Sequence, residues 1–377
     1  MDKPLRIMMV IDGYFPSVGG AEIQAGSLAK ALADKGHHVK IVSPRLRVNM
    51  AVHEIHNGIP VERISYPHIR YVGTIILCLK FAWKLLRERN RFDAIHVHMA
   101  KYLAAVAGFL RPLLNASLVV KISGAGEFNG GILDPGKKWN PLYRVMNFCI
   151  RRSDYIQSIS QYTKKMLVAS GYPEHKICMI PNGVDLSRFD FQRRLLGPRE
   201  LSPIVVYIGR IRQVKGVDIL IAAWGKLTNK RSARLLIAGD GSAKEDLEKT
   251  VNQMELSDSV QFLGVIKEIP DLLHRADIYV QPSRQEGLPN SVLEAMAMGL
   301  PIVATRISGN EDLVVDGKNG LLVPPQDPEK LAHVLGELID DVGRRQKMGL
   351  YSRRIIEDNY AFPVVADLLT RAYRRQL

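Results

Sequence analysis

Two carboxylates lie within one short stretch, residues 281–301, whose composition suits the binding of a polar ligand. The stretch follows an apolar, β-prone segment, so it should lie at the end of a buried strand. Glu286 lies in a Gly/Pro turn, and Glu294 lies eight positions later, in the first turns of a helix. Carboxylates accept hydrogen bonds from hydroxyl groups, which are the groups that a ribose or another sugar presents. The plain alternative for Glu294 is a partner of the helix dipole.

The start of this helix should supply further ligand contacts. Asn290 or Ser291 is the expected cap of a helix that begins near Val292, because a short side-chain oxygen there can accept from free backbone N–H groups. A helix N-terminus behind a glycine loop presents donors and a positive dipole end to a phosphate or sugar oxygen. The backbone N–H groups of Gly287, Leu288 and Asn290 are therefore candidate donors.

A second polar loop, residues 209–216, follows another predicted strand and carries Arg210 and Lys215. A guanidinium fork and an ammonium point charge together suit a diphosphate. Fixed cations can stabilise negative charge that grows on a diphosphate, so this loop favours electrostatic stabilisation and indicates no covalent nucleophile. A solvated basic loop is the alternative.

The remaining chain supplies elements that can position these residues. Residues 6–43 read as strand, glycine loop, helix and strand, which is a βαβ unit of a parallel sheet. Gly19 and Gly20 follow the first strand, at the edge where open α/β sheets bind ligands. A second strand–helix alternation starts near Ile204. The pattern predicts an α/β protein with two parallel-sheet domains.

Three more polar residues follow strands of the first alternation. His98 ends the predicted strand 92–98, and Ser123 and Glu127 follow the predicted strand 118–122. Carboxyl ends of parallel strands meet at one edge, so we expect all three to line a ligand site at that edge. A structural histidine is the alternative for His98.

Taken in order, these features resemble the retaining GT-B glycosyltransferases of the family 4 type, the group that includes glycogen synthases, sucrose synthases and mannosyltransferases. The resemblance covers nearly the whole chain. The motifs that carry it are the E-x7-E pair around GLPNSVLEAMA, the first-loop GGAE, the H-x-H of strand 92–98, the PNGVD turn at 181–185 and the GR…KG of loop 209–216.

The resemblance implies an architecture. It implies two Rossmann-like domains facing across a cleft, an acceptor-side domain over residues 1–187 and a nucleotide-sugar-binding domain over residues 200–358. Residues 186–202 would form the linker, and the last helix, about 359–377, would return to the first domain.

The resemblance also implies roles for the donor-site residues. Arg210 and Lys215 would bind the diphosphate and act in catalysis. Glu294 would bind the ribose, and Glu286 would lie beside the donor sugar as a catalytic residue. The loop that contains Gly19 and Gly20 would face the donor phosphates.

The implied reaction is transfer of a sugar from a nucleotide sugar, with a UDP-sugar favoured, to a polysaccharide or lipid-linked glycan, with retention and without a metal or other cofactor. The chain departs from the family at KISGAGE, where many members have a histidine that touches the donor sugar. Histidine assistance is therefore not expected here. Another GT-B enzyme, such as a sugar-nucleotide epimerase or a phosphorylase, and a non-catalytic nucleotide-sugar-binding protein stay open as alternatives.

Length and cysteine usage indicate the number of domains and the cellular compartment. A chain of 377 residues favours two domains. Its three cysteines are scattered and show no metal-binding spacing, which favours a reducing compartment such as the cytoplasm. No stretch approaches the roughly 18 apolar residues of a membrane-spanning helix.

The net charge of +14 is concentrated in the first half of the chain, where Lys and Arg most outnumber Asp and Glu. Nucleic acid is disfavoured as a partner, because no basic motif interleaved with aromatics is present. Residues 71–91 and 144–152 combine apolar and basic side chains. These segments fit either core-facing helices with solvated basic faces or peripheral attachment to an anionic membrane, on its inner face in a cytoplasmic protein.

Overall fold

The computed structural model describes residues 3–16, 20–124, 127–128, 131–137, 139–196, 202–227 and 233–377. The chain divides into two compact units, Met1–Gly183 with Phe362–Leu377, and Val184–Ala361. Each unit has its own sheet and its own apolar core. The predicted α/β class with two parallel-sheet domains is confirmed.

The N-terminal unit is built on a sheet with the strand order β3-β4-β2-β1-β5-β6-β7-β8. Its strands are β1 (Arg6–Ile11), β2 (His38–Pro44), β3 (His53–His56), β4 (Ile59–Ile64), β5 (Ala94–His98), β6 (Ser117–Ile122), β7 (Tyr155–Ser158) and β8 (Ile177–Met179). Its helices are α1 (Gly20–Asp34), α2 (Val72–Arg87), α3 (Tyr102–Leu110), α4 (Pro141–Ile150), α5 (Gln161–Ala169) and α13 (Phe362–Tyr373), with short 3-10 turns at η1 (Arg111–Leu113), η3 (Pro135–Lys137) and η4 (Glu174–Lys176).

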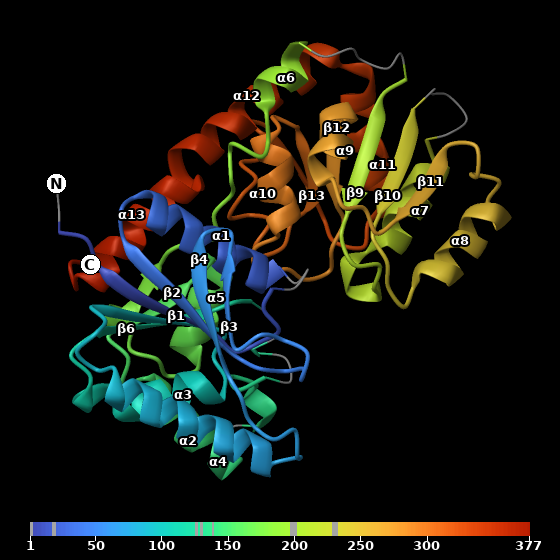
Figure 1. The fold of residues 1–377 in the computed structure, drawn as a ribbon. Helices are drawn as coiled ribbons and strands as arrows, with labels where there is room; N and C mark the ends of the chain where they lie inside the picture. The colour runs from blue at the N-terminus through green and yellow to red at the C-terminus, as the bar shows by residue number, and fades with distance from the viewer. Residues whose placement is uncertain are drawn as a thin grey trace. The chain divides into compact units, whose positions relative to one another are not determined.

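Helices cover both faces of this sheet, so its central strands are apolar along almost their whole length. Helices α2, α3 and α4 share one apolar core with one face, and α1 and α13 share a second core with the other (Figure 1). The parallel pairing of β1 with β5 and of β5 with β6 brings the carboxyl ends of these three strands to one edge.

One departure from the all-parallel expectation lies at the edge of this sheet. There, β3 and β4 pair antiparallel and form a hairpin. Asn57 and Gly58 make the turn with φ angles of 49° and 80°. Positive φ at both central residues is what a two-residue hairpin turn requires, and Asn-Gly is the dipeptide that adopts it most readily.

The C-terminal unit has a six-stranded parallel sheet in the order β11-β10-β9-β12-β13-β14. Its strands are β9 (Ile204–Ile208), β10 (Arg234–Ala238), β11 (Val260–Gly264), β12 (Ile278–Gln281), β13 (Ile302–Thr305) and β14 (Gly320–Val323). Its helices are α6 (Phe191–Leu196), η5 (Gln213–Lys215), α7 (Val217–Gly225), α8 (Lys244–Gln253), α9 (Ile269–Arg275), α10 (Asn290–Ala297), α11 (Pro328–Asp340) and α12 (Val342–Asn359). The strand order reverses between β9 and β12, the point at which doubly wound sheets bind ligands.

The stretch expected to link the domains is partly helical. Helix α6 occupies its middle, and Arg194 of α6 donates to the carbonyl oxygens of Gly299 at 3.3 Å and Ala276 at 2.8 Å. These bonds fasten α6 to the C-terminal unit. Helix α13 packs in the N-terminal unit, where the hydroxyl of Tyr373 lies 2.7 Å from His96 Nδ1 of β5.

Across the described residues, no helix combines the length and the apolar character that crossing a bilayer requires.

The packing of α3 against α4 gives a stability prediction. A methyl group on Gly108 of α3 would lie 2.1 Å from the carbonyl oxygen of Cys149 in α4. Gly108→Ala should therefore force the helices apart and lower the free energy of unfolding by about 1–3 kcal/mol. Gly343→Ala, in the first turn of α12, is the matched control. The methyl group added there would have Asp341 Oδ1 as its nearest neighbour, at an ordinary contact distance of 3.6 Å. Thermal unfolding of both variants checks this, and an unchanged Gly108→Ala transition would contradict it.

Candidate functional site

The loops after β9 and β12 touch through their backbones, at the switch point of the C-terminal sheet. Gly216 has φ +69°, and a methyl group on it would lie 2.0 Å from the carbonyl oxygen of Pro282. Arg284 joins the same loops, because its guanidinium makes two hydrogen bonds to Asp218 at 2.8 and 2.7 Å and its backbone N–H donates to Val214 at 2.8 Å. Only glycine permits this approach, which places the two predicted ligand loops side by side.

The contact between the loops brings Lys215 and Glu286 together, although 71 positions separate them in the chain. Lys215 Nζ lies 2.6 Å from Glu286 Oε1 and 2.8 Å from Oε2. The side chain of Glu286 is 7% exposed and that of Lys215 is 22% exposed. The carboxylate is therefore the more buried partner, and the ammonium is the one that solvent can reach. A lysine ammonium has three N–H donors, so a ligand oxygen can still accept from it.

Polar groups of β12 and its loop complete the surroundings of Glu286. Its Oε1 atom also accepts from Gln281 Nε2 at 2.6 Å and from Ser283 Oγ at 2.7 Å. Tyr279 donates its hydroxyl to Gln281 Oε1 at 3.0 Å, which orients the amide so that its nitrogen faces Glu286. The carboxylate is therefore fixed in position, because three donors converge on one of its oxygens.

Arg210 has a different environment from Lys215, although both were predicted as diphosphate ligands. Its side chain is exposed, whereas its carbonyl oxygen accepts from the Tyr207 hydroxyl at 3.1 Å. Gly209, the residue before Arg210, is also closely packed. Its carbonyl oxygen lies so near Gly239 that a methyl group on Gly239 would be 1.8 Å from it. The backbone under Arg210 is thus fixed while its guanidinium reaches into solvent.

Helix α10 begins at Asn290 rather than near Val292, and Pro289 occupies the cap position without a side-chain cap bond. The prediction that Asn290 or Ser291 caps the helix is therefore wrong, because proline's fixed φ already sets the entry into the first turn. In the described structure, the backbone N–H groups of Gly287 and Leu288 donate no hydrogen bond. These two amides remain candidate donors to a ligand.

Glu294 lies in α10 and is partly buried, and no hydrogen bond to its carboxylate is present among the described residues. Burial raises the pKa of Glu294 to about 7, and the charge of Arg188 opposes this shift only in part. Desolvation disfavours the carboxylate unless a donor reaches it. A ligand that offers hydroxyl groups would supply such donors.

The remaining candidates belong to the N-terminal unit. Gly19 lies outside the described residues, and Gly20 is the first residue of α1. His98 ends β5 and is fully buried, and neither ring nitrogen has a hydrogen-bond partner among the described residues. Burial lowers the pKa of His98, with His96 and Lys121 adding to the effect, so the ring is neutral at pH 7.

Ser123 and Glu127 contact each other in the loop after β6. The backbone N–H of Ser123 donates to Glu127 Oε1 at 2.9 Å, while the buried Ser123 hydroxyl has no partner in the described part of the chain. Burial raises the pKa of Glu127, and several backbone donors partly offset the effect. The loop therefore holds a carboxylate next to an unused hydroxyl.

Two residues at the same edge were not predicted as site residues. Lys121 of β6 is buried, and desolvation lowers its pKa to about 8 while Glu127 opposes the shift. Asp12 follows β1, accepts from the Leu103 N–H at 3.3 Å and has a pKa that burial raises. A charged residue at the end of an otherwise apolar strand was the available signal for both.

Metal-binding side chains do not gather in this structure: within the described ranges, no three His, Cys, Asp or Glu residues form a group that could hold an ion.

Two family models match the chain. The model for Glycosyltransferase Family 4 matches residues 18–188, and the model for Glycosyl transferases group 1 matches residues 202–341. The boundary between the two matches falls near the division between the two structural units.

Individual relatives extend over nearly the whole chain. The D-inositol 3-phosphate glycosyltransferase of Corynebacterium urealyticum is 33% identical over 392 residues, covering 94% of this chain and 90% of the relative. A GDP-mannose-dependent monoacylated alpha-(1-6)-phosphatidylinositol monomannoside mannosyltransferase of Corynebacterium glutamicum is 27% identical over 388 residues, covering 98% of each. The Anabaena protein HepE, solved in complex with UDP-glucose, has a TM-score of 0.76 at 20% identity, covering 98% of this chain and 99% of its own.

The environment of Glu294 gives a pH prediction. The folded-state pKa of Glu294 is about 7, above the ordinary value of 4.5. Between these two pH values, the folded protein therefore holds a proton that the unfolded chain has lost. The contribution of this group to stability is then present below about pH 4.5 and is lost as the pH rises to 7. Glu294→Gln, which is neutral throughout, should be more stable than the parent at pH 8 by on the order of 2–3 kcal/mol.

Urea unfolding at pH 5 and pH 8 measures this difference. Glu311→Gln, which alters an exposed carboxylate of the same unit, is the matched control and should follow the parent at both pH values. A Glu294→Gln variant that gains nothing between pH 5 and pH 8 would contradict the assignment of a buried, undersolvated carboxylate.

Proposed function

Because this chain belongs to the family 4 glycosyltransferases and has the GT-B fold, we propose that it moves a sugar from a UDP-sugar to a polysaccharide or lipid-linked glycan, with retention of the anomeric configuration. The chain is a glycosyltransferase of the type that uses nucleotide sugars. The identity of the base, the acceptor class and the stereochemistry are the proposed part.

The observation that carries the proposal is the arrangement at the switch point of the C-terminal sheet. Lys215 is fixed by Glu286 within 2.8 Å, and the unused amides of Gly287 and Leu288 belong to the same loop as Glu286. Glu294 follows on the helix that this loop enters. A fixed cation, two free N–H donors and a carboxylate that lacks donors suit the diphosphate and the ribose of a nucleotide.

Arg210 and Lys215 would act on the leaving group. As the bond from the sugar to the diphosphate breaks, negative charge grows on the diphosphate, and cations already held in place stabilise it without reorganising. We propose that this charge stabilisation replaces a metal ion. Glu286 contacts Lys215 directly in the described structure, so it would position the ammonium whatever contact it makes to the donor sugar.

The ligand and the names of the similar proteins support parts of this proposal. UDP-glucose is the ligand in the solved HepE complex, which favours UDP as the nucleotide. The corynebacterial mannosyltransferase is named for a GDP-mannose donor and an acylated acceptor. GDP is therefore the competing nucleotide, and a lipid-linked glycan is a reasonable acceptor.

Single substitutions should separate ground-state from transition-state contacts. Lys215→Ala and Arg210→Ala should lower kcat more than they raise the dissociation constant for the donor, with a loss of about 2.7–4 kcal/mol in kcat/KM. Glu294→Ala should mainly weaken donor binding, because it removes an acceptor of hydroxyl groups. Lys226→Ala, after the far end of α7, is the matched control and should leave both constants unchanged. Full activity in all three site variants, with the fold intact, would remove the assignment.

The proposal as a whole is tested in two steps. A thermal-shift screen with UDP-, GDP- and ADP-sugars should show the largest stabilisation with a UDP-sugar, since a ligand at 100 times its dissociation constant adds roughly 2.7 kcal/mol. NMR of the product should then show that the new glycosidic bond has the same anomeric configuration as the donor. The reaction should proceed equally with EDTA, since no metal ion is proposed. An inverted product would contradict retention, an epimerised donor without acceptor would identify an epimerase, and binding without turnover would identify a non-catalytic protein.

A further inference from the structure

Helix α2 has two apolar sides, and only one of them packs against the protein. Its inner side buries Leu77, Phe81 and Leu85 in the core of the N-terminal unit. Its outer side exposes Val72, Ile75, Leu79 and Trp83, with exposed fractions between 49% and 68%. An amphipathic surface helix normally turns its polar side to solvent. Packing within the unit therefore does not explain the outer stripe.

Helices α3 and α4 extend this apolar surface. Helix α4 buries Met146 and Ile150 but exposes Leu142, Val145 and Phe148, and Phe109 of α3 is 64% exposed. Helix α3 packs against both α2 and α4, and all three lie on the same side of the N-terminal sheet (Figure 1). We call the exposed apolar residues of these helices the outer helical face; they are Val72, Ile75, Leu79, Trp83, Phe109, Leu142, Val145 and Phe148.

The charges of these helices are all positive. The sequences of α2, α3 and α4 contain no Asp or Glu. Arg87 and Arg144 are exposed, and neither forms an ion pair with another described residue. Lys80 is also exposed, and its ammonium donates to the Ser65 carbonyl oxygen at 2.8 Å. Helices that expose apolar side chains and cations but contain no carboxylate match the boundary of an anionic bilayer.

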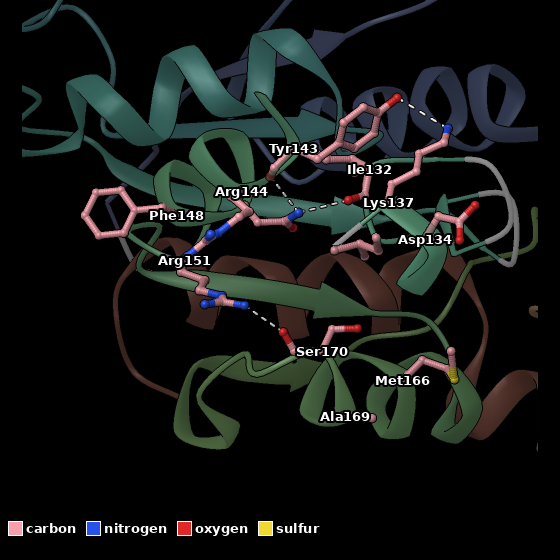
Figure 2. A pocket seen from close by; sticks show the side chains of 12 residues that line it. Ile132, Asp134, Lys137, Tyr143, Arg144, Phe148, Arg151, Met166, Ala169 and Ser170 are labelled. Carbon is pink, nitrogen blue, oxygen red and sulfur yellow. Dashed lines mark hydrogen bonds between the residues drawn. The ribbon is translucent and has the colours of Figure 1, made fainter. Parts of the chain in front are cut away.

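A pocket of about 510 Å³ adjoins α4, and the charged residues of its lining add to this positive charge. Phe148 and Arg144 line it together with Lys137 and Arg151 (Figure 2). Its lining holds three cations and one carboxylate, Asp134. The pocket therefore favours an anionic group and lies beside the apolar residues of the outer helical face.

We propose that the outer helical face docks this protein on an anionic lipid bilayer, with its apolar side chains at the acyl boundary and its cations at the headgroups. A second copy of the chain is the less suitable occupant, because a two-fold dimer through this face would set Arg87 and Arg144 against the same cations of the other copy. The inference does not depend on which nucleotide sugar the C-terminal unit binds.

The test is co-sedimentation of the full chain with vesicles of phosphatidylcholine alone and of phosphatidylcholine with phosphatidylglycerol. The protein should pellet with the anionic vesicles, and the pelleted fraction should fall as salt rises. Leu79→Ser combined with Trp83→Ser should lower the partition coefficient about tenfold or more. Arg144→Gln should lower it about fivefold.

Matched controls come from exposed residues of the C-terminal unit. Val265→Ser replaces an apolar side chain that is 72% exposed, and Lys249→Gln removes an exposed cation. Both should pellet like the parent, and thermal unfolding of every variant separates lost docking from lost folding.

Equal partitioning into the two vesicle types would overturn the proposal, as would site variants that pellet like the parent. A parent dimer that Leu79→Ser with Trp83→Ser dissociates would assign the face to a second copy and overturn it as well. A thermal shift with UDP-sugars is measured separately, so a failure of donor binding leaves this result interpretable.

Discussion

The backbone contact between Gly216 and Pro282 is the constraint on which the candidate donor site depends. Any side chain at residue 216 would meet the Pro282 carbonyl oxygen at 2.0 Å, so the loops after β9 and β12 can touch only through glycine. Their contact sets the ammonium of Lys215 on the carboxylate of Glu286. It also explains why Glu286 can be almost fully buried, since a buried carboxylate needs both a counter-charge and hydrogen-bond donors.

The two carboxylates of the E-x7-E pattern thus have opposite environments. Glu286 accepts from three side-chain donors, whereas Glu294 accepts no hydrogen bond from the described residues and has a pKa that burial raises to about 7. One carboxylate holds the ammonium of Lys215, and the other has no hydrogen-bond partner among the described residues. This difference accounts for their separate roles in the proposed reaction, in which one positions a cation and the other accepts hydroxyl hydrogen bonds.

The N-terminal unit combines two surfaces of different chemistry. Buried polar groups gather at the carboxyl ends of β1, β5 and β6, where Lys121 and Glu127 keep shifted pKa values and His98 stays neutral. Apolar side chains and cations gather instead on the exposed side of α2, α3 and α4. An enzyme whose acceptor is attached to lipid has use for both surfaces, one for the acceptor's polar groups and one for the bilayer that holds it.

The sequence by itself determined the two α/β alternations and placed Arg210, Lys215 and Glu286 in loops at strand ends, because parallel strands must present their carboxyl ends at one edge. It also determined the family, through motifs that lie in order along the chain. Only the tertiary structure decided that Lys215 and Glu286 form a pair, since nothing local relates residues 71 positions apart. The cap of α10 was mispredicted because the fixed φ of Pro289 sets the helix start without a side-chain cap. The orientation of α2 also required the fold: a helix with apolar residues all round has no pattern that says which side is buried, and the packing of Leu77 and Phe81 on the sheet left Leu79 and Trp83 exposed.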